Sequence, residues 1–179
     1  MTALLASFLM IGMLVVTGSR AAFMDTTDSP GNSFAAGTVE LVDDDTGSVM
    51  FSAAGMAPND TVTNCIVVTY QGSLTPAAVK LYGSVAGSGL AGYLDLTVEI
   101  GSGGAFGSCA GFASSATLYS GTVAGFAASH ADWASGLAAW SPATTPSSQT
   151  FRFTVTLQDD NAAQGLDASA DFTWEAQNA

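Results

Sequence analysis

Short stretches rich in β-branched and aromatic residues recur along this chain between turn signals, and this spacing limits the possible folds more than any other feature. The clearest stretch is FRFTVTL, residues 151–157, in which apolar side chains alternate with Arg and Thr. A period of two places the apolar set on one face of a strand and the polar set on the other. The stretch DFTWE, residues 171–175, alternates in the same way. Both stretches are therefore predicted to be half-buried strands.

Six other stretches carry a similar signal, and helix is scarce. A turn or two of helix is expected within residues 123–136, the Gly-rich residues 101–112 and residues 140–150 are expected to be loops, and Asn59 suits a left-handed turn position. Eight or so short strands separated by turns favour one all-β domain, a jelly-roll-type β-sandwich. The expected strands are residues 37–42, 48–52, 61–70, 77–83, 93–100, 116–123, 151–157 and 170–175.

The charge of the chain excludes several classes of partner. Its 179 residues carry 15 acidic and 3 basic side chains, for a formal net charge of -12. Nucleic-acid backbones and anionic lipid headgroups are both bound through Lys and Arg, so this surface would repel them. The C-terminal FTWEAQNA has neither an apolar tail nor a basic stop. We therefore expect no nucleic-acid partner and no stable membrane anchoring of the mature chain.

The N-terminal run ALLASFLMIGMLVV, residues 3–16, is apolar throughout. It is shorter than the roughly 20 residues that span a bilayer, and small residues follow it at the spacing of a signal-peptidase site. We interpret residues 1–21 as a signal peptide that is cut between Ala21 and Ala22, giving a protein secreted to the extracellular matrix or cell surface. A buried core helix is the alternative, although the run has no polar face. Basic residues are missing before the run, so translation is expected to start further upstream.

Two cysteines, Cys65 and Cys109, remain in the chain. In an exported protein they are expected to form a disulfide, which closes a loop of about 44 residues. A metal pair is the alternative, but two thiols and one histidine are too few for a closed zinc site.

Residues on both sides of the expected cut resemble the TasA and camelysin (CalY) family of secreted biofilm-matrix fibre proteins. Small residues precede an aromatic and an acidic residue in AAFMD, and NSFAAGTVEL then carries the family's Asn-x-Phe-x-Ala-Gly-Thr pattern. Later segments are similar to the family's Pro-Gly-Asp turn, its Asn-Gly-Ser-Leu segment and its Asn-x-x-Gln-Gly turn before a final aromatic strand. The matching positions are Asn32, Phe34, Ala36, Gly37 and Thr38, then Pro58, Asn59 and Asp60, then residues 71–74, and finally Asn161, Gln164 and Gly165.

The resemblance implies an exported protein, processed by a signal peptidase of the SipW type, whose copies assemble into extracellular fibres. It also implies that the N-terminal segment of one mature copy adds as a strand to the sheet of another copy. Residues 22–36 would then form an arm ahead of the domain at 37–179. An arm folded back on its own sheet is the alternative. The arm residues expected to matter are Ala22, Phe23, Met24, Asp25 and Phe34, of which Phe23 and Met24 could enter an apolar groove.

Camelysins are also classed as metallopeptidases, an activity that requires metal-ligating side chains. A catalytic zinc site takes three protein ligands, yet His130 is the only histidine and no HExxH is present. We therefore expect no enzyme activity, no catalytic residue and no cofactor, apart from weak Ca²⁺ binding by the turn acids at 43–45 or 159–160. Asn59-Asp60-Thr61 fits a glycosylation sequon, which is a weak signal. A monomeric binding module or adhesin is the second functional hypothesis, and a metallopeptidase is the third.

Overall fold

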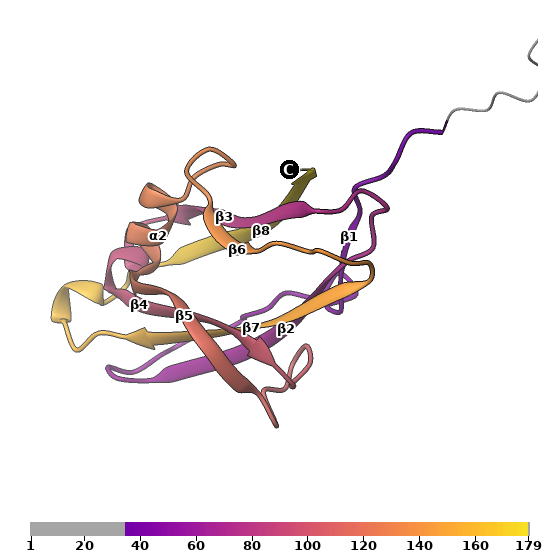
Figure 1. Cartoon of the computed structure of the whole chain (residues 1–179). Coiled ribbons are helices and arrows are strands. Elements are labelled where there is room, and N and C mark those ends of the chain that lie inside the picture. The colour runs from indigo at the N-terminus through magenta and orange to yellow at the C-terminus, as the bar shows by residue number, and fades with distance from the viewer. Residues whose placement is uncertain (1–34, 179) are drawn as a thin grey trace, which may run out of the picture. The chain divides into compact units, whose positions relative to one another are not determined.

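Eight strands and one α-helix make up the part of the chain that the computed structural model describes, residues 35–178. Figure 1 shows the strands in two stacked layers, and every strand pairing is antiparallel. The all-β, sandwich-type fold predicted from the sequence is therefore confirmed. The predicted leader, cut and arm lie outside the described residues, with Ala21, Ala22, Phe23, Met24, Asp25, Asn32 and Phe34.

The two sheets differ in size. The larger has the order β1-β2-β7-β4-β5 and the smaller the order β6-β3-β8. The larger sheet contains β1 (Leu41–Asp43), β2 (Thr61–Tyr70), β7 (Ser147–Leu157), β4 (Leu94–Ser102) and β5 (Ala113–Thr122). The smaller contains β6 (Leu137–Trp140), β3 (Ala77–Gly87) and β8 (Ala168–Asn178). Helix α2 (Val123–Ser129) and the 3-10 helices Leu90–Tyr93 and Asn161–Ala163 complete the elements.

Five crossings between the layers interlock the sheets. The chain leaves the larger sheet for the smaller between β2 and β3, between β5 and β6 and between β7 and β8, and it returns between β3 and β4 and between β6 and β7. Strand β2 pairs with β7 along ten residues, and β3 pairs with β8 along eleven. This arrangement leaves β8 at the edge of its sheet, with β3 as its only strand neighbour among residues 35–178.

Aromatic side chains from β7 and β8 meet in the core. Phe151 and Phe153 are fully buried on β7, and the ring of Phe153 lies 4.7 Å from the ring of Phe172 on β8. Phe151 lies 5.4 Å from Trp174, also on β8. The alternation of FRFTVTL and DFTWE therefore predicts the core faces of both strands correctly.

Several predicted boundaries are wrong. Residues 48–52 form no strand, and within the predicted strand 37–42 only residues 41 and 42 belong to β1. Met50 and Phe51 of the 48–52 segment pack against the core without a partner strand, which the local pattern cannot reveal. The loop expected at 140–150 ends earlier, because β7 begins at Ser147, and β6 was not predicted. Asn59 has a φ of 68°, as its turn position predicts.

The core packing gives a first prediction. Phe153→Ala should lower the free energy of unfolding by about 3–5 kcal/mol, because it removes a fully buried ring and leaves a cavity. The adjacent Thr154→Ala, on the outer face of β7, is the control and should change stability by less than about 1 kcal/mol. Urea denaturation of the two variants measures the difference. Equal losses in both would contradict the assignment of the core face.

Candidate functional site

The outer edge of β8 is the first element of the candidate site. Because β3 occupies one edge of β8, the backbone N–H and C=O groups that point the other way have no strand partner among residues 35–178. An unpaired edge of this kind is a template on which another strand can pair. It runs for 11 residues, which is long for an exposed edge.

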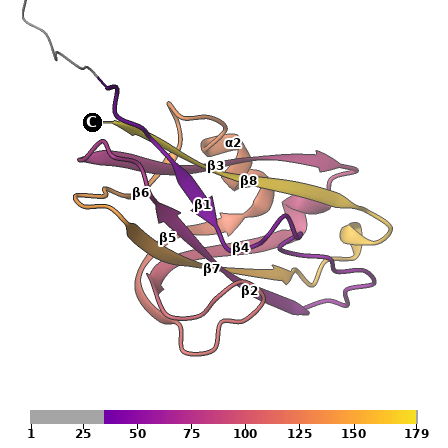
Figure 2. The ribbon, with the colours of Figure 1, turned by 90° about the vertical axis from the view of Figure 1, so that its right-hand side faces the viewer.

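A groove of about 530 Å³ lies beside this edge. Its floor is apolar and consists of core side chains, so an inserted side chain would be removed from water there. One wall is β8 itself and the other is the segment between β1 and β2. Figure 2 shows this segment, in purple, emerging from β1 and running toward β2. The floor contains Val62, Ile66, Leu90, Leu94, Val123 and Val155.

The side chains on the β8 wall increase in size along the strand. Its core-facing positions read Ala168, Ala170, Phe172 and Trp174, and all four line the groove. The alanines leave space at one end of the groove, whereas the two rings fill the other end. Although Phe172 and Trp174 pack against the core, both stay partly exposed because no strand covers them. The indole N–H of Trp174 is buried without a hydrogen-bond partner in the described structure.

The opposite wall is residues 48–56, which we call the strap. Met50 and Phe51 pack against the core cluster, and Met56 also lines the groove, while Val49 is 76% exposed. The strap contains no strand, and a side chain holds it: the Nδ2 of Asn64 donates a hydrogen bond to the Met50 carbonyl at 2.6 Å. This wall therefore depends on β2 for its position.

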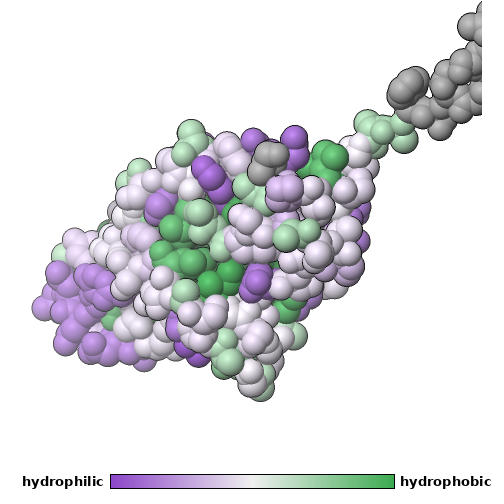
Figure 3. All heavy atoms as spheres, viewed as in Figure 1, coloured by the Kyte–Doolittle hydropathy of each residue, from purple (hydrophilic) through white to green (hydrophobic). Residues whose placement is uncertain are grey.

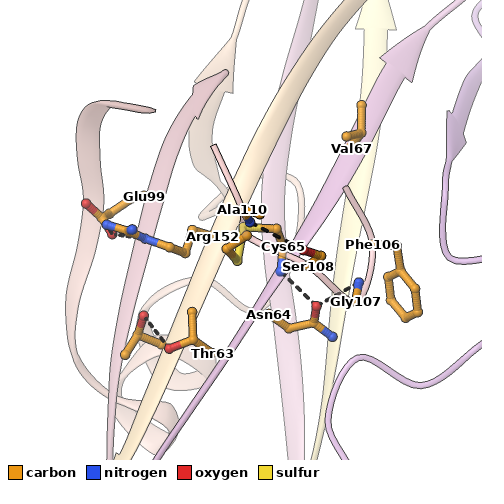
Figure 4. The surroundings of a disulfide bond; sticks show 12 residues. Thr63, Asn64, Cys65, Val67, Glu99, Phe106, Gly107, Ser108, Ala110 and Arg152 are labelled. Carbon is orange, nitrogen blue, oxygen red and sulfur yellow. Dashed lines mark hydrogen bonds and ion pairs between the residues drawn. A yellow bond between two sulfur atoms is a disulfide. The ribbon is translucent and has the colours of Figure 1, made fainter. Parts of the chain in front are cut away.

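The cysteines form a disulfide, Cys65–Cys109, with a Cα–Cα distance of 5.2 Å (Figure 4). It fastens the Gly-rich loop, residues 103–112, onto the outer face of β2. Two amide groups of this loop then reach side chains near the strap: Phe106 N donates to Asp44 Oδ2 at 2.8 Å, and Gly107 N donates to Asn64 Oδ1 at 2.9 Å. The disulfide, the loop and the strap are thus linked by consecutive contacts.

One carboxylate of the acidic turn at 43–45, before the strap, is engaged in hydrogen bonds with the backbone. Asp44 is partly buried, and its Oδ1 accepts a hydrogen bond from Val67 N at 2.8 Å. Burial raises the pKa of Asp43, and the side-chain hydrogen bond with Asp45 and the charges of Asp45 and Asp44 raise it further, against the opposing effect of the hydrogen bond from Asp45 N. Asp45 itself lies at the rim of the groove.

The sandwich has a second opening, between β5 and β6. Figure 3 shows apolar side chains gathered there, on the face turned to the viewer. Leu118, Leu137, Ala139 and Trp140 are partly buried at this opening and pack against the core. Strand β6 has only four residues, so the edge available here on the smaller sheet is much shorter than β8.

The family-type turn residues have structural roles. Thr38 N donates to Ser73 Oγ at 2.9 Å, and a side chain at Gly37 would collide with Leu74. Asp60 closes the turn before β2, because its Oδ2 accepts from Ala57 N at 2.7 Å. Gly165 has a φ of 73°, which suits glycine, in the turn before β8. Pro58 and Gln164 are exposed in these same two turns.

His130 does not fit a zinc centre. Its Nδ1 lies 2.8 Å from the Ser135 carbonyl, and its ring packs against Tyr119 and Phe126. Hydrogen bonds from the backbone and side chain of Ser135 lower the pKa of Asp132, which is therefore engaged in its own turn. Within residues 35–178 no three potential ligands gather around a common point.

Two comparisons with known proteins bear on this chain. The model of the camelysin metallo-endopeptidase family matches residues 2–90, which include β1, β2, β3 and the strap. No curated protein matches the chain. Among residues 35–178, no helix has both the length and the apolar character needed to cross a membrane.

The disulfide gives a second prediction. Replacing both cysteines by alanine should lower the free energy of unfolding by about 3–4 kcal/mol, because the unfolded chain loses a constraint across 44 residues. Differential scanning calorimetry of oxidised, reduced and doubly substituted protein measures the loss. An equal melting temperature in all three forms would contradict it.

Asp43 gives a third prediction, on pH dependence. A carboxyl group with a raised pKa in the folded state binds its proton more tightly there than in the unfolded chain, so its contribution to stability falls as pH rises past about 4. Asp43→Asn removes this charge and should raise the melting temperature at pH 7 more than at pH 3. Melting curves at both pH values check the sign. A gain that is larger at pH 3 would contradict it.

Proposed function

The chain belongs to the camelysin family, and we propose that it is a secreted structural subunit whose copies assemble into extracellular fibres by strand addition. The observation that carries the proposal is the unpaired edge of β8 above an apolar groove. Strand addition uses both parts of such a site: the edge supplies main-chain hydrogen bonds, and the groove holds alternate side chains.

The proposed occupant is the arm of a second copy, residues 22–34, once the leader has been removed. These 13 residues span about 43 Å when extended, and the 11 residues of β8 span about 36 Å. The arm is therefore long enough to cover the whole edge. Phe23 and Met24 are its large apolar side chains near the free end, and they match an apolar floor.

Fibres follow from the asymmetry of this contact. The arm and the groove are different surfaces of one chain, so each copy donates one and accepts with the other. A head-to-tail contact that does not close into a ring continues as a filament. The leader would prevent this contact while it remains attached, because the arm would then have no free end.

The groove gives a fourth prediction, which uses the two openings of the sandwich. Ala170→Arg places a charged side chain at an exposed, core-facing position of β8 and should abolish fibres. Ala116→Arg is the matched control: Ala116 is exposed on β5 opposite the buried Ile100, beside the second opening. Negative-stain microscopy of both variants and of a chain lacking residues 22–33 measures assembly.

We expect the Ala116→Arg variant and the unaltered mature chain to form fibres. We expect Ala170→Arg and the chain lacking residues 22–33 to form none. Fibres from Ala170→Arg with none from Ala116→Arg would move the acceptor site to the second opening. Fibres from the chain without the arm would overturn strand donation, and a monomer in every case would favour the binding-module hypothesis. Melting curves should show that both arginine variants remain folded.

A further inference from the structure

We propose that the Cys65–Cys109 disulfide and Asn64 position the strap as a wall of the acceptor groove, so that forming the disulfide completes the groove. This inference rests on the proposed function, because the ligand of the groove is the arm of a second copy. Asn64 is a positioning residue: it lines no part of the groove itself and acts through the strap.

The strap has few other attachments in the described structure. Between residues 49 and 56 the one carbonyl or amide with a hydrogen-bond partner is the Met50 carbonyl, which accepts from Asn64. Its residues Val49, Met50, Phe51, Ala53 and Met56 nevertheless make up most of one groove wall. Apart from the Ser48 N bond to the Asp45 carbonyl at its start, the wall is held by this one backbone contact and by the packing of Met50 and Phe51, so releasing the contact should let it open more often.

The amide of Asn64 is oriented by the Gly-rich loop. Its Oδ1 accepts two hydrogen bonds, from Cys65 N at 2.8 Å and from Gly107 N at 2.9 Å, which fixes the Nδ2 group toward Met50. Asp44 adds a second attachment just before the strap, since its carboxylate accepts from both Val67 N and Phe106 N. We call Asp44, Asn64 and the disulfide the clasp.

The disulfide is what holds the donors of the clasp in place. Phe106 and Gly107 belong to a loop with four glycines at positive φ, Gly103, Gly104, Gly107 and Gly111, and Cys109 ties that loop to the fully buried Cys65. Without this bond a glycine-rich loop regains much of its conformational freedom, and its amides no longer meet Asp44 and Asn64 reliably.

Assembly should therefore depend on oxidation of Cys65 and Cys109 to the disulfide. The two thiols lose two electrons and two protons to a disulfide-bearing oxidant, which becomes a dithiol. In a reducing compartment the groove would lack a fixed wall, and after export the disulfide would complete it. A preorganised groove binds its strand more tightly because less ordering remains to be done on binding.

Asn64→Asp tests the clasp at its link to the strap. The carboxylate keeps both acceptor contacts, to Cys65 N and Gly107 N, but loses the hydrogen bond to Met50. Asn161→Asp is the control, since it adds the same charge at an exposed position that lines no part of the groove. Both variants, and the wild type with its disulfide intact or reduced, are prepared as the chain that begins at Ala22 for cleavage and fibre formation, and without residues 22–33 for peptide binding, so that the groove is not filled by another copy's arm.

Two measurements distinguish local release of the strap from a general loss of stability. Chymotrypsin cleavage after Phe51 reports release of the strap, and cleavage after the buried Phe153 reports global unfolding. Binding of a fluorescent peptide with the sequence of residues 22–34 reports the groove. We expect Asn64→Asp and reduction each to speed cleavage after Phe51 and to raise the Kd of the peptide, both by about three- to tenfold.

The outcomes are distinct. Unchanged cleavage after Phe51 in Asn64→Asp would overturn the clasp, and so would faster cleavage with unchanged peptide binding. In Asn64→Asp, equal acceleration at Phe51 and Phe153 would show general destabilisation and would also overturn it; the comparison is made on this variant because reduction is itself expected to lower global stability. If the oxidised wild type binds no peptide and forms no fibres, the proposed function fails, and the inference fails with it.

Discussion

The aromatic contact between β7 and β8 is the interaction on which the rest of the structure depends. Phe151 and Phe153 lie fully buried in the larger sheet and meet Trp174 and Phe172 of the smaller one. These rings hold the two layers together next to the place where the smaller sheet ends. Since two of these rings, Phe172 and Trp174, also line the groove, part of the core is the surface that a second copy would bind in the proposed assembly.

The two sheet edges beside the groove, those of β2 and β8, differ in how their backbone groups are covered. Along β2, the strand β1 covers one part, and the side chains of Asp44 and Asn64 accept from the outward amides of Val67 and Cys65. Carboxylate and amide groups in these positions block pairing with a foreign strand. Strand β8 has no comparable protection within residues 35–178. The contrast favours β8 as the edge that is kept available for assembly.

The sequence predicts the strands whose faces differ in polarity and says little about their partners. The strand at 151–157 has a clear period of two because one of its faces is buried, whereas 61–70 is predicted from its β-rich composition, since Cys65 and Ile66 on its two faces are both buried. The groove could not be predicted, since it depends on which strands end at an edge and on long-range contacts such as Asn64 to Met50. The strand prediction at 48–52 is wrong because Val49, Met50 and Phe51 have the composition of a strand, while only Met50 and Phe51 pack against the core and Val49 is exposed. Fold class follows from local pattern, whereas the acceptor site follows from topology.

A density map of the assembled protein, at a resolution that separates neighbouring strands, would test the central claim most directly. The account predicts an additional strand beside the outer edge of β8, continuous with the domain of the adjacent subunit and carrying the sequence of residues 22–34. An edge of β8 that stays unpaired in the assembly, or a strand there that belongs to the same subunit, would contradict it.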